Sequence, residues 1–496
     1  MIVGKSNSLT PGGDRAAAPG TAVAPGSAVA RETAPAPPLS SSSRASVWII
    51  AAGVFVVNLD LFIVNVAVPA LGDAFHGSSL ASLSWVLNAY AIVFAALLVV
   101  AGRLADRYGH RRGFLLGLAV FTAASALCAV APGVGWLVAA RALQAVGAAA
   151  LMPTSLALLL VNTPAERRPR AIRSWAAIGG IAASLGPVVG GVLVEADWRW
   201  VFLVNVPVGV IGLLAGARLL PDARPHREGP FPDLVGAVLL TFAIAALALA
   251  LVKADAWGWS SPGVLVPLFA TAVLAMGFWM RSARHPAPVV ELPMLRTRTF
   301  ATATLAALLF TVAFAAMLLT SVLWCQQVWG YSAIRTGLAI APGPLVVPVL
   351  AVLSGPVVRR LGAGRTAALG CLLFACGLAW WAVALGAAPH YASGFLPGMV
   401  VTGIGVGLAL PTLVGAAAEA LPPTRFATGS AVTTMARQTG SVLGVALMVT
   451  LLGAPDGPGE ALDAFRHGWW AAAVTAVLAA FTALALHRPG TASPSV

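Results

Sequence analysis

Residues 48–70 read WIIAAGVFVVNLDLFIVNVAVPA, a stretch of 23 residues in which Asp60 is the only charged side chain. Wound as an α-helix, the stretch is about 35 Å long, enough to cross the ~30 Å hydrocarbon core of a bilayer. A strand does not fit, because membrane strands are about half this length and alternate in polarity. The stretch therefore predicts a membrane-spanning helix with one acid near its middle.

Further apolar runs of similar length follow along the chain, and together they predict an all-α integral membrane protein with fourteen transmembrane helices. The runs lie at 48–70, 80–101, 113–131, 136–161, 172–194, 200–219, 234–252, 264–280, 300–323, 336–358, 366–385, 395–417, 429–452 and 468–486.

The composition agrees with a bilayer environment. Hydrophobic residues make up 59% of the chain and charged residues 9%, whereas soluble domains carry about 25% charged residues. The net charge is +13, but no basic stripe with interleaved aromatic residues is present, so we expect no nucleic-acid partner.

The cysteines lie in apolar stretches outside any CxxC or Cys/His pattern, which predicts no disulfide, metal site or cofactor. They are Cys128, Cys325, Cys371 and Cys376.

The placement of Lys and Arg predicts the orientation, since cytoplasmic loops carry an excess of both. With the N-terminus placed in the cytoplasm, 24 of the 30 basic residues fall in the tails and cytoplasmic loops. This distribution predicts a multi-pass protein of a bacterial inner membrane with both termini in the cytoplasm. The preference for Arg over Lys, together with much Ala, Gly and Pro, is typical of a GC-rich bacterial genome. The exceptions are Arg199, Lys253, Arg335 and Arg466 outside, and Arg141 and Arg437 within spans.

Two pairs of segments repeat along the chain. GRLADRYG at 102–109 matches GPVVRRLG at 355–362, and GAAALMPT at 147–154 matches GVGLALPT at 405–412 at a similar separation. We therefore expect two related six-helix bundles, the design with which many secondary transporters alternate access. The predicted parts are a disordered cytoplasmic tail at 1–46, the N-terminal bundle at 47–220, a linker with two extra transmembrane helices at 221–299, the C-terminal bundle at 300–487 and a cytoplasmic tail at 488–496.

Asp60 is the one carboxylate that we place near the middle of a predicted span. An ionised side chain there costs at least ~2.5–3.5 kcal/mol, so it needs a partner, a water-filled cavity or a proton. Because burial favours a neutral acid, an acid whose exposure alternates can load and release protons. Arg141, three residues before Gln144, is the natural electrostatic partner of Asp60 or of an anionic substrate. These residues predict a proton-coupling site. The alternatives are an Asp60 that only holds helices together and an Arg141 that snorkels to the outer interface.

Polar and aromatic residues within the spans are candidates for a substrate cavity, because flat apolar ligands pack on aromatic rings. Interface belts and lipid-facing positions are the alternative for the tryptophans, and bracing of the helix packing is the alternative for Arg437. The candidates are Asn65, Trp85, Tyr90, Gln144, Trp175, Trp324, Gln327 and Arg437.

Several segments resemble motifs of the major facilitator superfamily, and in particular of its fourteen-helix drug:proton antiporter family. The loop at 102–112 resembles the superfamily's signature loop, and 59–69 resembles the first-helix motif of the antiporter family. The segment 141–144 resembles the fourth-helix motif tied to proton coupling. Gly186-Pro187-x-x-Gly190-Gly191 resembles the fifth-helix antiporter motif, and 198–207, 326–342 and 437–440 look like further motifs. The resemblance covers roughly residues 46–488, with departures at Phe62, Ala145 and Ala182, where Thr, Gly and Gly are usual.

The resemblance implies a major facilitator fold and roles for two sets of motif residues. Asp106 would pair with a helix N-terminus and a nearby Arg of the opposite half when the cavity opens outward. Arg359 replaces this acid in the second copy, which implies an asymmetric latch. The implied conformational residues are Gly102, Asp106, Arg107, Gly109 and Arg112, and those of the antiporter motif are Gly186, Pro187, Gly190 and Gly191.

We therefore expect a proton-coupled antiporter that exports drug-like or antibiotic molecules by alternating access, and not an enzyme. Its partners would be a small-molecule substrate, protons and the lipid bilayer, and it would act as a monomer. No GxxxxGK[ST] segment is present, so we expect the proton gradient and no nucleotide to drive it. The alternatives are a dedicated exporter of one native metabolite, a symport importer, and a membrane enzyme or receptor. The Gly-Pro motif argues against import, and no cluster of His, Cys or paired carboxylates supports catalysis.

Overall fold

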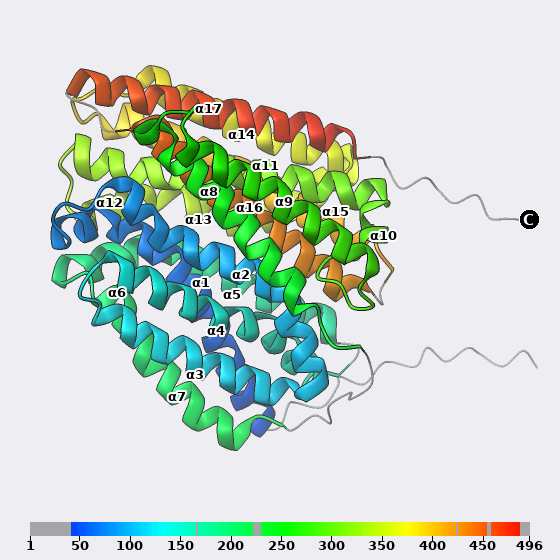
Figure 1. Cartoon of the computed structure of the whole chain (residues 1–496). Helices are drawn as coiled ribbons and strands as arrows, with labels where there is room; N and C mark the ends of the chain where they lie inside the picture. Colours follow the sequence, from blue (N-terminus) through cyan, green and yellow to red (C-terminus); the bar gives the residue numbers. More distant parts are fainter. Residues whose placement is uncertain (1–40, 165–166, 222–229, 423–424, 454–457, 487–496) are drawn as a thin grey trace, which may run out of the picture. The chain divides into compact units, whose positions relative to one another are not determined.

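The computed structural model describes residues 41–486 except 165–166, 222–229, 423–424 and 454–457. Within these residues 14 helices are long and apolar enough to cross a membrane, and the arrangement is helical throughout (Figure 1). The predicted all-α architecture and number of spans are confirmed. The first helix begins at Ser41, inside the stretch predicted as a tail, and the remainder of both predicted tails lies outside the described residues.

The helices follow the chain in three groups, two of which are large. The N-terminal group is α1 (Ser41–Ala74), α2 (Leu80–Tyr108), α3 (His110–Ala129), α4 (Val134–Val161), α5 (Arg168–Ala196), α6 (Trp200–Leu203) and α7 (Asn205–Leu219). The middle group is α8 (Leu234–Trp257), α9 (Pro262–Arg284) and α10 (Leu292–Leu295). The C-terminal group is α11 (Arg298–Leu323), η2 (Trp324–Val328), α12 (Ala333–Ile340), α13 (Pro342–Leu361), α14 (Ala363–Ala384), η3 (Tyr391–Phe395), α15 (Leu396–Glu419), α16 (Phe426–Leu452) and α17 (Pro458–Leu484).

Each large group packs as its own bundle, and the two bundles meet along two helix pairs. In the N-terminal bundle α1 packs on α5, and α4 packs on α2 and α3. In the C-terminal bundle α14 packs on α15 and α17, and α11 packs on α16 and α17. The bundles contact each other mainly through α2 with α16 and α5 with α12. Figure 1 shows α8 lying along α16 and α2, which it contacts.

The inserted pair α8–α9 is held together at one end by a buried acid. Asp233 Oδ1 caps α8 by accepting from the Gly236 backbone N–H at 2.8 Å, and it also accepts from Arg281 Nε of α9 at 2.5 Å. Most of α9 carries large exposed apolar side chains, among them Phe269 and Trp279. Such a helix is stable where lipid replaces water as its solvent.

The internal repeat predicted from the sequence is present in the backbone. The turn after α2 is Gly109 with φ of 104°, and the turn after α13 is Gly362 with φ of 82°. Side chains other than glycine rarely adopt this region, so glycine lets the next helix start directly in both bundles. The two copies of the signature loop therefore make the same turn.

The second repeated pair forms a close helix crossing in each bundle. A Cβ at Gly147 in α4 would lie 2.5 Å from the backbone N of Phe121 in α3, and a Cβ at Gly405 in α15 would lie 2.7 Å from the backbone N of Phe374 in α14. Glycine at these positions permits contact between helix backbones, as is common in membrane bundles.

We predict that Gly147→Ala and Gly405→Ala each destabilise the protein by about 1–3 kcal/mol, the usual cost of overpacking. Gly415 is the matched control, because it lies in α15 and no atom lies within 4 Å of a Cβ built there. Gly415→Ala should leave the Tm unchanged or raise it, since Ala favours helix by up to ~1 kcal/mol over Gly. Thermal unfolding of the purified protein in detergent measures the effect, and equal Tm values for all three variants would contradict the crossing geometry.

Candidate functional site

A hydrogen-bonded network surrounds the carboxylate of Asp60 in α1. Arg141 of α4 donates through Nη1 to Oδ2 at 2.5 Å. Gln144 Nε2 and Asn205 Nδ2 each donate to Oδ1 at 2.9 Å. Ser125 Oγ of α3 accepts from both amides, at 2.8 Å from Gln144 and 3.4 Å from Asn205. Helices α1, α3, α4 and α7 therefore converge on one acid.

The guanidinium of Arg141 also binds groups other than Asp60. Its Nη1 donates to Gln144 Oε1 at 2.6 Å, and its Nε donates to the backbone carbonyl of Val86 in α2 at 3.2 Å. Its Cζ lies 4.2 Å from the centroid of the Tyr90 ring, within the range of a cation–π contact. Arg141 is 1% exposed, so in this structure it lies against Asp60 and not at an interface.

The polar groups of this network are removed from solvent. Asp60 and Gln144 are 0% exposed and Asn205 is 1% exposed. A buried charge without a partner is costly, whereas a paired and hydrogen-bonded one is tolerated. Removing either charge leaves the other uncompensated, at a cost of about 3–5 kcal/mol. Proton exchange at Asp60 therefore requires the network to open.

Two members of the network were not among the predicted site residues. Asn205 is the first residue of α7. The feature of the sequence that could have identified it is a polar amide at the start of a span, within the segment 198–207. Ser125 also donates to the Phe121 carbonyl of its own helix at 2.8 Å, as isolated membrane serines commonly do. Nothing in the sequence separates Ser125 from such a serine.

The predicted cavity residues of the N-terminal bundle lie in different places. Tyr90 and Gln144 belong to the network above. Trp85 packs against the cluster that joins α2, α8 and α16. Asn65 donates to a carbonyl of its own helix at 3.0 Å, and Trp175 donates to the Ser155 hydroxyl at 3.0 Å. These three residues do not contact Asp60 through any described hydrogen bond.

In the C-terminal bundle, the predicted cavity residues Trp324 and Gln327 lie in different surroundings. Trp324 is 0% exposed, and its ring lies 4.9 Å from that of Trp469 in an edge-on contact, so it is a packing residue in this structure. Gln327 is exposed, while its neighbour Gln326 donates to the Val66 carbonyl of α1 at 3.2 Å. Both residues lie in the π-helical turn η2, whose larger number of residues per turn changes which side chains face the other bundle.

The glycines of the fifth-helix motif lie where α5 meets α1 and α12. A Cβ at Gly186 would lie 2.5 Å from Cβ of Phe62, and one at Gly190 would lie 3.0 Å from a backbone carbonyl of α1. A Cβ at Gly191 would lie 2.5 Å from a backbone carbonyl of α12, and the Pro187 carbonyl also faces α12. The motif therefore permits the backbones of the two bundles to touch.

Among the residues that the structure describes, the acid of the signature loop has no partner in the opposite bundle. Asp106 is 64% exposed and pairs with His110 of its own half at 3.5 Å. A Cβ built at Gly102 would make only an ordinary van der Waals contact with Pro153. The side chain of Arg112 is exposed. The pairing expected for Asp106 concerns another conformation and remains a prediction.

The connection after α9 contacts both halves. Glu291 accepts from Arg103 Nη2 of α2 at 3.3 Å and lies 3.8 Å from Arg425 Nε, which precedes α16. Arg107 places its Cζ 6.0 Å from the ring of Phe231, in the connection before α8. The inserted segment is therefore linked to the signature loop.

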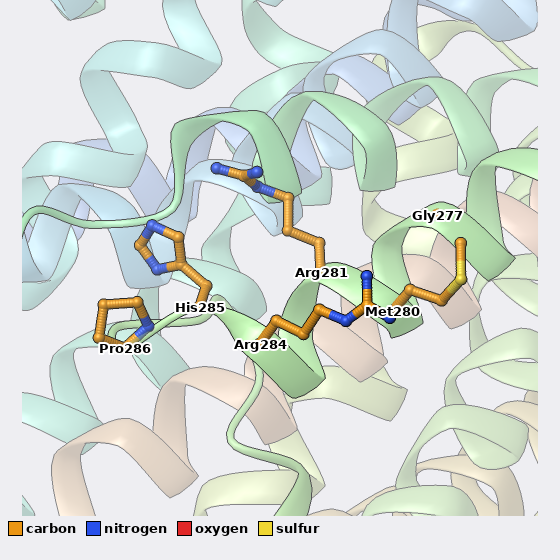
Figure 2. A pocket seen from close by; sticks show the side chains of 6 residues that line it. All are labelled: Gly277, Met280, Arg281, Arg284, His285 and Pro286. Atoms are coloured by element: carbon orange, nitrogen blue, oxygen red, sulfur yellow. The ribbon is translucent and has the colours of Figure 1, made fainter.

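A pocket at the end of α9 is separate from the Asp60 network. Figure 2 shows its lining, in which Arg281 is the residue already paired with Asp233. Among the described residues no group of His, Cys, Asp or Glu is arranged to hold a metal ion. The pocket is lined by Gly277, Met280, Arg281, Arg284, His285 and Pro286.

We predict that losing one member of the Asp60–Arg141 pair is more harmful than losing both. Asp60→Asn and Arg141→Gln should each lower the free energy of unfolding by about 3–5 kcal/mol, because each leaves a buried charge without its counter-charge. The double variant should recover much of the loss, as measured by thermal unfolding. Asp73→Asn, an exposed acid on the same helix, is the control. Losses that simply add in the double variant would mean that the two residues are not coupled.

Comparison with known proteins agrees with the fold and the motifs. The family model of the Major Facilitator Superfamily matches residues 50–445. The chain is 34% identical over 429 residues to the tetracenomycin C resistance and export protein of Streptomyces glaucescens, covering 85% of this chain and 77% of that protein. It is 35% identical over 407 residues to the multidrug resistance protein Stp of Mycobacterium tuberculosis (strain CDC 1551 / Oshkosh), covering 81% and 74%.

Solved structures show the same fold. A bacterial homologue of the human lysosomal transporter Spinster aligns with a TM-score of 0.63 at 16% identity, covering 90% of this chain and 97% of that chain. The matched family consists of transporters and not of enzymes. This chain is a multi-pass membrane protein and belongs to the major facilitator superfamily, in its fourteen-helix branch.

Proposed function

We propose that this protein is a proton-coupled antiporter that exports drug-like or antibiotic small molecules across a bacterial membrane by alternating access. The buried Asp60–Arg141 pair carries the proposal, because it places one titratable acid inside a bundle of movable helices. The names of the two relatives support the substrate class, since both are resistance proteins and one is an export protein.

In the proposed cycle Asp60 exchanges its proton when the helices around it separate. Asp60 lies on α1 and Arg141 on α4, so a shift of one helix against the other breaks their contact and opens the acid to a proton. Protonation then leaves Arg141 without its counter-charge. The protonated and ionised forms therefore favour different helix arrangements, which is the condition for a ligand to shift a conformational equilibrium.

We infer that this structure represents the state in which the pathway is closed at the end of the bundles away from the 102–112 loop. Two observations support this: Gln326 donates to the Val66 carbonyl between the bundles, and Gly191 lies against α12 near the end of α5. Asp106, at the other end, has no described contact with the C-terminal bundle. In a rocking cycle the contacts at Gln326 and Gly191 open as the end of the bundles that carries the 102–112 loop closes.

Two further features belong to the proposal. Both termini lie in the cytoplasm, because the arginine-rich loops then face the cytoplasm. The protein acts as a monomer, since the Asp60 network is complete within one chain. Export of one native metabolite is the alternative, and the name of the Streptomyces relative, which joins resistance to export of a single compound, favours it.

We predict that Asp60→Asn abolishes drug efflux driven by an imposed pH gradient in proteoliposomes, because the amide cannot take up and release the transported proton. Efflux should fall to the level of vesicles without protein. Exchange of labelled for unlabelled drug at equal pH should persist, since it needs no proton exchange.

The matched variant for this assay is Asp73→Asn, which changes an exposed acid at the end of the same helix and should transport like the wild type. If pH-driven efflux by Asp60→Asn equals that of the wild type, Asp60 is not the coupling residue.

The orientation is tested with fusions at the C-terminus. Green fluorescent protein fused there should fluoresce in cells, and alkaline phosphatase fused there should be inactive, because the first folds in the cytoplasm and the second outside it. The opposite pair of results would reverse the proposed topology.

A further inference from the structure

α16 carries a guanidinium near the middle of its span. The span covers Thr428–Leu452, which places Arg437 about 14 Å from one end and about 22 Å from the other at 1.5 Å per residue. In a ~30 Å hydrocarbon core this is about 10 Å below the nearer edge. Snorkelling serves arginines near helix ends, so Arg437 needs an acceptor within the protein or on a ligand.

Among the described residues Arg437 has no ion-pair or hydrogen-bond partner, and its Nε is buried. The adjacent Gln438 is 8% exposed, and its Nε2 is also buried without a partner. Arg141, the other arginine at such depth, donates to three acceptors. Buried polar groups are normally satisfied, so two neighbouring donors without acceptors mark a place where an acceptor is expected.

Arg437 lies on an inward face of α16. Thr433 Oγ1 lies 3.3 Å from Thr304 Oγ1 of α11, and a Cβ at Gly440 would touch a backbone carbonyl of the same helix. Val442 marks another face, which packs on α2 and α8. Arg437 is one turn after Thr433 and about one turn before Gly440, so it shares their side of the helix. Because α11 contacts α1 and α16 contacts α2, this side lies close to the junction of the two bundles.

The charges inside the spans add up to a positive pathway. Asp60 is neutralised by Arg141, which leaves Arg437 as an uncompensated cation among the described span interiors. When Asp60 takes up a proton, Arg141 adds a second positive charge. In neither protonation state does the interior attract an organic cation, and in both it attracts an anion.

We propose that Arg437 binds the acidic group of the substrate, so that the protein exports organic anions such as carboxylates and phenolates. The inference rests on the proposed export function and adds the charge of the substrate. An anionic oxygen accepts from the guanidinium of Arg437, and a guanidinium binds such a group more strongly than a neutral donor does. A carboxylate or phenolate thus supplies the acceptor that the C-terminal bundle lacks at this point.

The experiment compares two xanthene dyes of opposite charge, anionic fluorescein and cationic rhodamine 123, in proteoliposomes with an imposed pH gradient. Wild-type protein should move fluorescein at least about tenfold faster than rhodamine 123. Arg437→Gln should reduce fluorescein transport by at least about tenfold, the effect of losing one hydrogen bond to a charged group. Arg437→Lys, which keeps the positive charge, should retain the preference for fluorescein.

A second readout separates binding from packing. The Tm of Arg437→Gln should equal or exceed that of the wild type, because the change removes a half-buried cation that has no described partner. A lower Tm with equal loss of both dyes would assign Arg437 to packing and overturn the anion site. Transport of rhodamine 123 at least as fast as fluorescein, or full fluorescein transport by Arg437→Gln, would also overturn it. Wild-type protein that moves neither dye would instead contradict the proposed export of drug-like molecules and favour the export of one native metabolite.

Discussion

An ionised carboxylate inside a bilayer persists when a counter-charge and hydrogen-bond donors surround it, and this requirement organises the N-terminal bundle. Asp60 accepts from Arg141, Gln144 and Asn205, and Arg141 in turn holds the Val86 carbonyl. These bonds draw α1, α2, α4 and α7 to a single point. Because breaking the pair costs about 3–5 kcal/mol, the arrangement of these helices and the charge of the acid cannot change independently. Coupling between protonation and conformation follows from this dependence.

The two bundles share a backbone design and differ in their charges. Gly147 and Gly405 make the same crossing against a phenylalanine of the preceding helix, so the repeat preserves how helices approach each other. The C-terminal bundle has no described counterpart of the Asp60–Arg141 pair, and its deep cation, Arg437, has no described partner. A fold does not determine the chemistry placed on it. We propose that the first copy handles the proton and the second copy handles the charge of the substrate.

The fold and the centre of the site were predictable from the sequence, and the reasons are physical. Long apolar runs must be helices in a bilayer, and an acid and an arginine within them must find each other or a cavity. Trp324 and Gln326 were not predictable in this way. The composition of a span does not distinguish a tryptophan that packs against other helices from one that lines a substrate pathway. The π-helical turn η2 also changes which side chains face the other bundle, compared with a regular α-helix. Glu291 lies in a connection, where hydropathy carries no information about contacts.

The exposed ion pairs that join the bundles differ in energy from the buried pair inside the N-terminal bundle. Between the bundles, the contacts at Gly191 are between backbones, without interlocking side chains. The bridge from Glu291 to Arg103 and Arg425 is partly exposed, and such surface ion pairs contribute about 0–1 kcal/mol each. The Asp60 network lies within one bundle, and removing one of its charges costs about 3–5 kcal/mol. In the proposed cycle, opening of the network and a change of charge at Asp60 therefore occur together.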